Sequence, residues 1–163
     1  MNIEIVRVTK EEYPKLENIF QLYLHELSAY FKADFNNETC KYEYDLIKYL
    51  DNDNNISYFI KEDNNICGFL LIDILENNTY EISETFIINN YKKRHLGTKA
   101  VTRIFNMYKG DWIIKTVPNS PVAEPFWTKV IEKYTNNNYK KIYTGKYNRA
   151  ELYFNNLDIK DNS

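Results

Sequence analysis

Residues 80–101, YEISETFIINNYKKRHLGTKAV, constrain the fold most, because the hydrophobic period changes from strand to helix across a short basic turn. Alternation within the strand-like run 82–88 places Glu84, Phe86 and Ile88 on one face and Ser83, Thr85 and Ile87 on the other. From Leu96 onward, apolar residues recur at intervals of three and four, and Gly110 ends the predicted helix. The segment therefore predicts a strand, a tight turn and an amphipathic helix.

The turn between this strand and this helix is strongly basic. Lys92, Lys93, Arg94 and His95 directly precede the helix, and Gly97 lies in its first turn. Main-chain N–H groups at a helix N-terminus have no intrahelical partners and favour negative charge. We therefore expect an anion, and a diphosphate in particular, to bind at this turn.

The six residues 92–97, KKRHLG, resemble the pyrophosphate signature of the GNAT superfamily of acetyl-CoA-dependent N-acetyltransferases, Arg/Gln-x-x-Gly-x-Gly/Ala. Two positions depart from it, with Lys92 in place of Arg or Gln and His95 in place of the first Gly. The family's turn binds mainly through main-chain donors. The resemblance implies that the cofactor's diphosphate contacts Lys92, Lys93, Arg94, His95, Leu96, Gly97 and Thr98.

A second stretch, residues 117–134, VPNSPVAEPFWTKVIEKY, is similar to the family's second conserved region. The matching residues are Asn119, Ala123, Phe126 and Trp127. Residues 22–31 and 66–74 also look like the family's first helix and third strand, so the resemblance covers nearly the whole chain. It implies that Asn119, Phe126 and Trp127 flank the cofactor.

The resemblance also implies an α/β fold with a mixed, mostly antiparallel sheet of six to seven strands, flanked by about four helices. In this fold, the strand ending at Ile88 and the strand starting at Trp112 run parallel and splay apart, which leaves a cleft for the pantetheine arm. Unpaired main-chain groups of Phe86, Ile87 and Ile88 would bind the pantetheine amides. An N–H near Ile88 would polarise the thioester carbonyl.

The remaining elements follow from periodicity and turn residues. The pattern predicts strands at 3–8, 56–61, 66–75, 112–117, 139–147 and 150–154, a helix from Glu11, a shorter helix over 42–50, and a helix starting at Ser120 and Pro121. The strands at 56–61 and 66–75 and the strand that contains Glu84 should be antiparallel.

Attack of an amine on a thioester requires removal of a proton from nitrogen and protonation of the leaving thiolate. Glu84 is the candidate base, because it shares a strand face with Ile88 and precedes it by four residues. A solvent-facing or cross-strand Glu84 explains the pattern nearly as well. Trp127 occupies the position where the family often carries an acidic Tyr, and Tyr134 lies two turns further on. Either another tyrosine serves as the acid, or none does.

Composition fits one domain over residues 1–163 that lies in the cytoplasm. No apolar run reaches membrane-spanning length, and the formal net charge of -2 disfavours a general nucleic-acid binder. Cys40 and Cys67 provide no disulfide framework. With His25 and His95 they form no ligand spacing, so we expect no metal site.

The sequence therefore predicts transfer of acetyl from acetyl-CoA to a primary amine of a small molecule, peptide or protein, by a monomer or homodimer. Two alternatives stay open. One is a non-catalytic CoA-binding regulatory module, favoured by Trp127 at the expected acid position. The other is an RNA-associated protein that uses the lysines of 92–99 and 139–147, whose aromatic and basic residues alternate.

Overall fold

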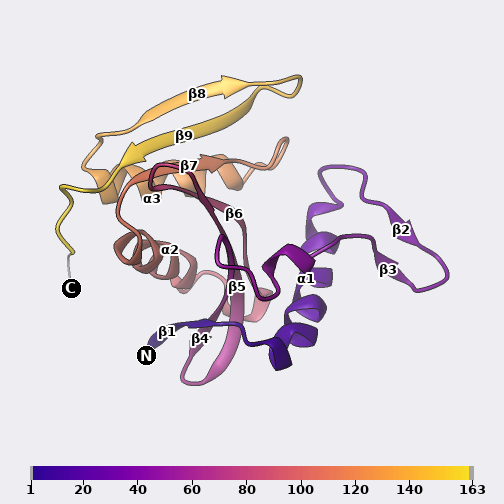
Figure 1. Cartoon of the computed structure of the whole chain (residues 1–163). Coiled ribbons are helices and arrows are strands. Elements are labelled where there is room, and N and C mark those ends of the chain that lie inside the picture. The colour runs from indigo at the N-terminus through magenta and orange to yellow at the C-terminus, as the bar shows by residue number, and fades with distance from the viewer. Residues whose placement is uncertain (1, 162–163) are drawn as a thin grey trace.

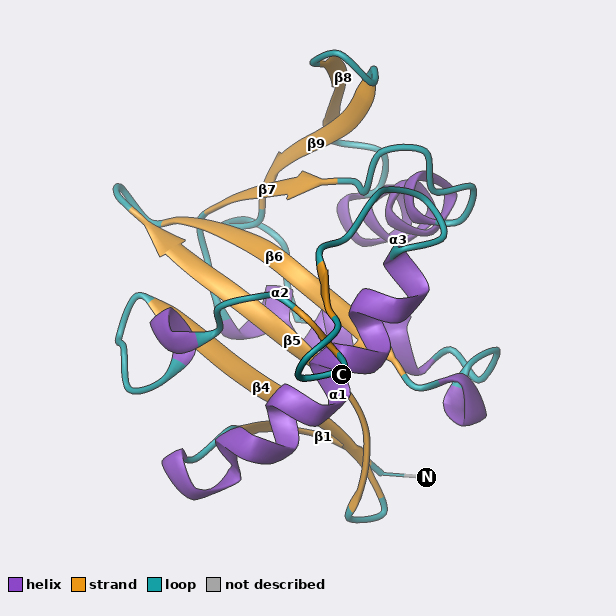
Figure 2. Cartoon of the chain, turned by 90° about the vertical axis from the view of Figure 1, so that its right-hand side faces the viewer, coloured by secondary structure: helices purple, strands orange, loops and turns teal. Residues whose placement is uncertain are grey.

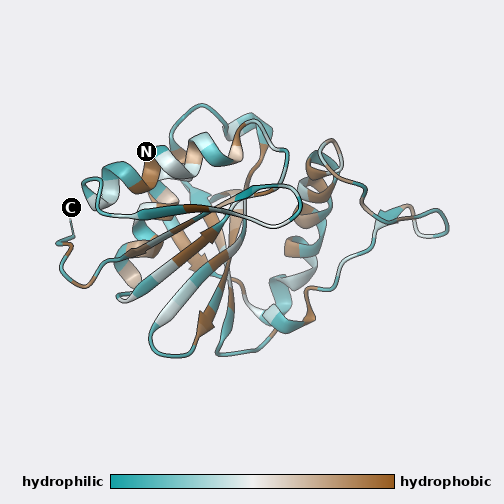
Figure 3. Ribbon diagram, turned by 90° about the horizontal axis from the view of Figure 1, so that it is seen from above, coloured by the Kyte–Doolittle hydropathy of each residue, from teal (hydrophilic) through white to brown (hydrophobic). Residues whose placement is uncertain are grey.

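The structure is a computed structural model that describes residues 2–161. At its centre is a seven-stranded sheet in the order β1-β4-β5-β6-β7-β9-β8. Its strands are β1 (Ile3–Arg7), β4 (Asn55–Glu62), β5 (Asn65–Leu75), β6 (Thr79–Ile87), β7 (Asp111–Lys115), β8 (Lys140–Thr144) and β9 (Arg149–Asn155). A separate hairpin of β2 (Phe35–Asn36) and β3 (Lys41–Tyr42) extends away from the body (Figures 1 and 3).

Three α-helices accompany the sheet within residues 2–161, namely α1 (Tyr13–Leu27), α2 (Leu96–Met107) and α3 (Ala123–Thr135). Short 3₁₀ turns lie at η1 (Lys10–Glu12), η2 (Ile47–Tyr49) and η3 (Asn89–Tyr91). The predicted mixed α/β sheet is confirmed. Within it, β6 and β7 pair in parallel and all other neighbouring strands pair antiparallel.

The helices lie on both faces of the sheet and create two apolar cores (Figures 1 and 2). Helices α2 and α3 cover the core around Leu70, Phe105 and Trp112. Helix α1 covers the second core, around Phe20 and Phe69. The apolar parts of the ribbon concentrate on the strands between these helices (Figure 3). Alternate side chains of the central strand β5 thus pack in different cores, which explains why the sequence of this strand is apolar on both faces.

The shorter helix predicted over 42–50 does not form, and this prediction is wrong. Tyr42 belongs to β3, where its main-chain N–H and C=O both bond the Gln21 side chain. Further along, the Asp45 carboxylate accepts the N–H of Ile47 at 2.8 Å. Such a local side-chain bond competes with helix formation. Only the single turn η2 remains.

Helix α3 begins at Ala123, two residues after the predicted start. The Ser120 hydroxyl accepts the Ala123 N–H at 3.2 Å, so it serves as a side-chain acceptor for the first turn. Pro125 fits here because first-turn N–H groups need no intrahelical acceptor. Within residues 2–161, no helix has both the length and the apolar character that a membrane crossing requires.

Candidate active site

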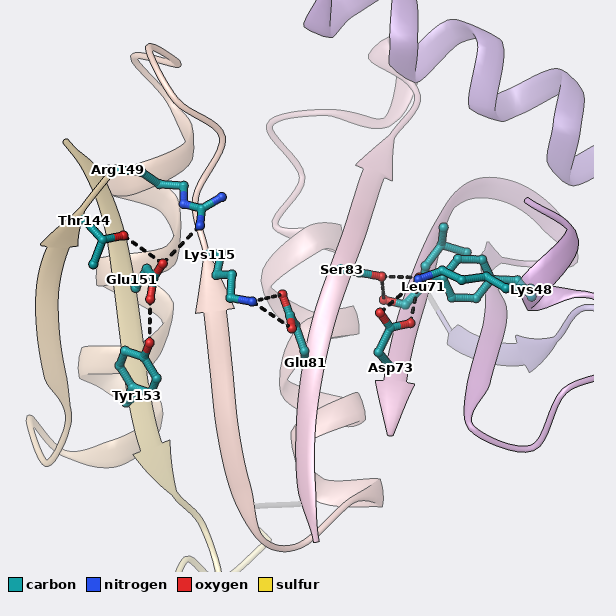
Figure 4. Close-up of polar contacts among 11 residues, drawn as sticks. Lys48, Leu71, Asp73, Glu81, Ser83, Lys115, Thr144, Arg149, Glu151 and Tyr153 are labelled. Atoms are coloured by element: carbon teal, nitrogen blue, oxygen red, sulfur yellow. Dashed lines mark hydrogen bonds and ion pairs between the residues drawn. The ribbon is translucent and has the colours of Figure 1, made fainter. Parts of the chain in front are cut away.

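The parallel strands β6 and β7 separate after a short contact, and a cleft opens between them. Their pairing covers only Thr79–Glu81 against Asp111–Ile113. Lys115 of β7 forms an ion pair with Glu81 of β6 at 3.2 Å beside the point of separation (Figure 4). A cavity of about 640 Å³ follows, lined by residues of α1 and β6 and by the starts of α2 and α3.

A β-bulge in β6 determines which way the cleft side chains point. Leu71 of β5 pairs with Glu84 while Ile72 pairs with Ile82, so Ser83 is an extra residue. Ile82 therefore packs in the core under α2 and α3, whereas Phe86 packs in the core under α1.

The bulge also turns Ser83 to the α1 side, where the sequence alternation did not place it. Its hydroxyl lies 2.5 Å from the Tyr49 hydroxyl, and Tyr49 belongs to the core under α1. Tyr49 also donates to Asp73 at 2.7 Å, and Lys48 pairs with Asp73 (Figure 4). The predicted opposition of Ser83 and Glu84 is wrong because the extra residue interrupts the period of two.

Glu84 reaches the cleft as a largely desolvated carboxylate. Burial is the main cause that raises its pKa to about 7, and repulsion from Asp73 adds to this. A hydrogen bond from the Tyr23 hydroxyl opposes the shift. A carboxyl group with this pKa exchanges protons near neutrality, which is the property of a general base.

The main chain of β6 offers donors and acceptors to the cleft, but not at every residue expected. Ile88 donates its N–H to the Cys67 carbonyl at 2.9 Å, so the predicted unpaired N–H at Ile88 is wrong. Because antiparallel partners alternate, Phe86 also faces β5, while Thr85 and Ile87 direct their main-chain groups toward the cleft. Thr85 and Ile87 are thus the residues able to pair with an extended ligand.

The turn before α2 has the backbone conformation of an anion site. Lys93 and His95 adopt left-handed φ angles of 62° and 59°. His95 occupies the family's first Gly position, and His is among the residues that tolerate this region. As N-cap, His95 makes no side-chain capping bond, so the first N–H groups of α2 keep no side-chain partner there. Their arrangement with the left-handed residues fits a diphosphate.

The side chains of the turn divide between the cleft and the protein. Lys92 forms an ion pair with Glu26 of α1 and lies over the Phe86 ring. Arg94 instead binds Glu62 at the end of β4, at 2.8 Å. Within residues 2–161, Lys93 has no ion-pair partner. Lys93 is therefore the turn's most available positive charge.

The cavity collects most of the predicted site residues. Those that line it are Glu84, Phe86, Ile87, Lys92, Lys93, His95, Leu96, Gly97, Thr98, Phe126 and Trp127. Ile88, Arg94 and Asn119 are not among the lining residues. Gly97 faces the Phe126 ring and the Ile87 side chain, so it joins the starts of α2 and α3 to β6.

Sequence reasoning missed the contribution of α1 to the cavity. Tyr23, Glu26 and Leu27 of α1 line it, together with Tyr30, which follows the helix, and Tyr91. Tyr23 and Leu27 lie on the apolar stripe of α1, which predicts burial rather than a site. A useful signal was available, since a buried Tyr hydroxyl needs a polar partner.

Tyr134 lies away from the cleft, with its hydroxyl donating to Asn106 at 2.9 Å and its ring against Phe105. No group of three or more His, Cys, Asp or Glu side chains suited to a metal occurs among residues 2–161. The aromatic and basic strand β8 is partly engaged by α3, because Lys141 and Tyr143 both contact Glu124. This occupies part of the surface that RNA would need.

Comparison with solved structures identifies the same architecture in acetyltransferases. An acetyltransferase from Thermus thermophilus has a TM-score of 0.70 at 13% identity, covering 95% of this chain and 97% of that one. The PaiA N-acetyltransferase from Thermoplasma acidophilum, solved in complex with coenzyme A, has a TM-score of 0.64 at 14% identity, covering 95% and 99%. A Methanocaldococcus jannaschii domain has a TM-score of 0.64 at 18% identity, covering 94% and 98%.

A comparison with curated proteins finds no significant match. The family model described as Acetyltransferase (GNAT) family, in contrast, matches residues 16–145, which include most of α1, the cleft and the turn before α2. The matched residues contain the parallel strands β6 and β7, which separate at the cleft, and the start of α2, which has no side-chain cap. The chain therefore belongs to the acetyltransferase (GNAT) family.

Proposed function

We propose that this protein transfers the acetyl group of acetyl-CoA to the nitrogen of a primary amine, in the cytoplasm. The observation that carries the proposal is Glu84, a half-buried carboxylate with a pKa of about 7 in the cavity that continues to the turn before α2. A base that titrates near neutrality and an anion site thus share one cavity.

In this proposal the chain binds the co-substrate along its length. The N–H groups of Leu96, Gly97 and Thr98 and the Lys93 ammonium hold the diphosphate. Thr85 and Ile87 pair with the pantetheine amides through the main chain, while Trp127 and Phe126 form an apolar wall. The Ile87 N–H takes the role first expected near Ile88, as a donor to the thioester carbonyl oxygen.

Glu84 then accepts the proton that the acceptor nitrogen loses as it attacks. Its second carboxylate oxygen is available for this role, because within residues 2–161 the only hydrogen bond to the Glu84 carboxylate is the one from Tyr23. The acceptor can be a small molecule, a peptide or a protein lysine.

A screen of amines with acetyl-CoA, with released thiol as the readout, tests this proposal. Wild-type protein should release thiol with at least one amine, and Glu84→Gln should lower turnover by about 10²-fold or more with nearly unchanged acetyl-CoA affinity. Trp127 at the family's acid position favours a second candidate, a CoA-binding module without catalysis. Tight CoA binding without amine-dependent thiol release across the screen would select that candidate.

A further inference from the structure

The Tyr23 hydroxyl reaches the cleft from the α1 side and bonds the candidate base directly. Its ring is held between Phe69 and Phe86, with ring centroids at 5.6 Å and 5.7 Å. The side chain is almost fully buried, yet Tyr23 lines the cavity. Its hydroxyl donates to one carboxylate oxygen of Glu84. The contact therefore joins two proton-carrying groups at one wall of the cleft.

Other candidates for the acid are less well placed. Trp127 has no transferable proton at working pH, and the Tyr134 hydroxyl bonds Asn106 outside the cavity. Tyr30 and Tyr91 line the cavity but make no hydrogen bond with Glu84. Tyr23 is thus the one cleft tyrosine in residues 2–161 that is coupled to the base.

We propose that Tyr23 and Glu84 form a single proton shuttle, in which Glu84 takes the proton of the acceptor nitrogen and Tyr23 protonates the departing thiolate. The proposal rests on the proposed acetyl transfer. As the C–N bond forms and the C–S bond breaks, the nitrogen proton passes to Glu84. Tyr23 gives its hydroxyl proton to sulfur and regains one from Glu84, so both groups return to their starting states.

The coupling resolves an energetic difficulty. A phenol, with an ordinary pKa of about 10, is a weaker acid than a thiol of about 8.5, so an isolated Tyr would be a poor donor to a thiolate. Burial and the Glu84 carboxylate raise the pKa of Tyr23 further. Once Glu84 is protonated, however, it replaces the proton that Tyr23 gives up. No phenolate then persists in the buried site.

Several charged or titratable groups surround the pair and belong to any account of its pH dependence. They are Glu26 on α1, Tyr44 before η2, Lys48 in η2, Asp73 on β5 and Glu81 on β6. Lys48 pairs with Asp73, Glu81 with Lys115 and Glu26 with Lys92, which leaves Glu84 as the carboxylate without a cationic partner among these.

The test compares Tyr23→Phe with wild type and with Tyr134→Phe, a matched control that also loses a hydrogen-bonded Tyr hydroxyl but lies outside the cavity. Tyr23→Phe should lower kcat by about 10²-fold while KM for acetyl-CoA stays within about twofold. Because the Tyr23 hydrogen bond lowers the pKa of Glu84, the acidic limb of the pH–rate profile should move to higher pH. Tyr134→Phe should match wild type in both readouts.

A readout without turnover uses protein labelled with ¹³C at the glutamate carboxyls. The Glu84 signal is the one absent from Glu84→Gln, and its midpoint should rise in Tyr23→Phe but not in Tyr134→Phe. An unchanged midpoint or an unchanged pH–rate profile in Tyr23→Phe would overturn the shuttle. The shuttle would also be overturned if Tyr30→Phe or Tyr91→Phe lowered kcat in this way while Tyr23→Phe kept wild-type activity. A wild type that binds CoA but acetylates no amine overturns the proposed function and the shuttle together.

Discussion

The Glu62 carboxylate at the end of β4 binds the Arg94 guanidinium of the turn before α2 at 2.8 Å, and their side chains are 6% and 37% exposed. Arg94 lies between Lys93 and His95, both of which have left-handed φ angles. Such conformations are costly for residues other than glycine and persist where the surroundings hold them. The ion pair ties the turn to the sheet, so its main-chain donors stay directed outward.

Glu62→Gln should therefore weaken CoA binding although Glu62 does not line the cavity. Loss of the ion pair frees the turn, and we expect a decrease in affinity of about tenfold, or ~1.4 kcal/mol. The matched control is Glu151→Gln, because Glu151 pairs with Arg149 at side-chain exposures of 10% and 37% and does not line the cavity (Figure 4). Equal CoA affinity in both variants, measured by calorimetry, would show that the ion pair does not organise the turn.

Glu84→Gln should change the pH dependence of stability as well as activity. The pKa of Glu84 rises from 4.5 to about 7 on folding, so between these values the folded state binds more protons than the unfolded state. Stability of the wild type must then fall as pH rises through this window. The Gln variant does not lose this stability. Its melting temperature should therefore rise relative to that of the wild type as the pH increases from about 5 to about 8. If the plots of melting temperature against pH were parallel for the two proteins, Glu84 would not be desolvated in the folded state.

Trp127 should report cofactor binding through its fluorescence. It lines the cavity, whereas Trp112 lies in the core with its indole N–H bonded to the Tyr108 carbonyl. Added CoA should change the emission of the wild type and of Trp112→Phe, but much less that of Trp127→Phe. A full change retained in Trp127→Phe would place Trp127 away from the cofactor.

The same ring should also matter for stability, because Trp127 is buried, with 7% of its surface exposed. Trp127→Ala should cost about 3–5 kcal/mol of unfolding free energy, measured by denaturant titration. Trp127→Phe should retain activity within about tenfold, since it keeps most of the wall and since no proton transfer is assigned to the indole. A loss of activity much larger than this in a stable Trp127→Phe would give the indole N–H a role of its own.

The parts of the fold that the sequence predicted well are those determined by the local spacing of apolar residues. The β6–turn–α2 unit and the antiparallel pairing of β4, β5 and β6 follow from alternation and from the switch to a helical period. The bulge at Ser83 was not predictable in this way, because it is defined by the register against β5. Tertiary contacts also determine the conformation of residues 42–50, because the Gln21 side chain bonds the main chain of Tyr42 in a hairpin.

For the site, sequence located the groups that belong to one continuous segment. It did not predict that Arg94 turns toward Glu62 or that Ile88 is bonded to Cys67, because both partners come from other strands. It also missed Tyr23, which the stripe of α1 presents as an ordinary core residue. Contacts between distant segments thus decide which residues of a matched motif reach the cleft.

Calorimetric titration of CoA into wild type, Gly97→Ala and Gly97→Asp tests the central claim most directly. A Cβ at Gly97 would meet Phe126 and Ile87 at ordinary distances of 3.5 Å and 3.6 Å, so the Ala variant controls for added bulk. We expect one-to-one binding by wild type, similar affinity for Gly97→Ala, and strongly weakened binding for Gly97→Asp, with about 1.5–3 kcal/mol lost per charge-assisted contact. No CoA binding by the wild type, or equal affinity in a folded Gly97→Asp, would contradict the assignment of this cleft to CoA.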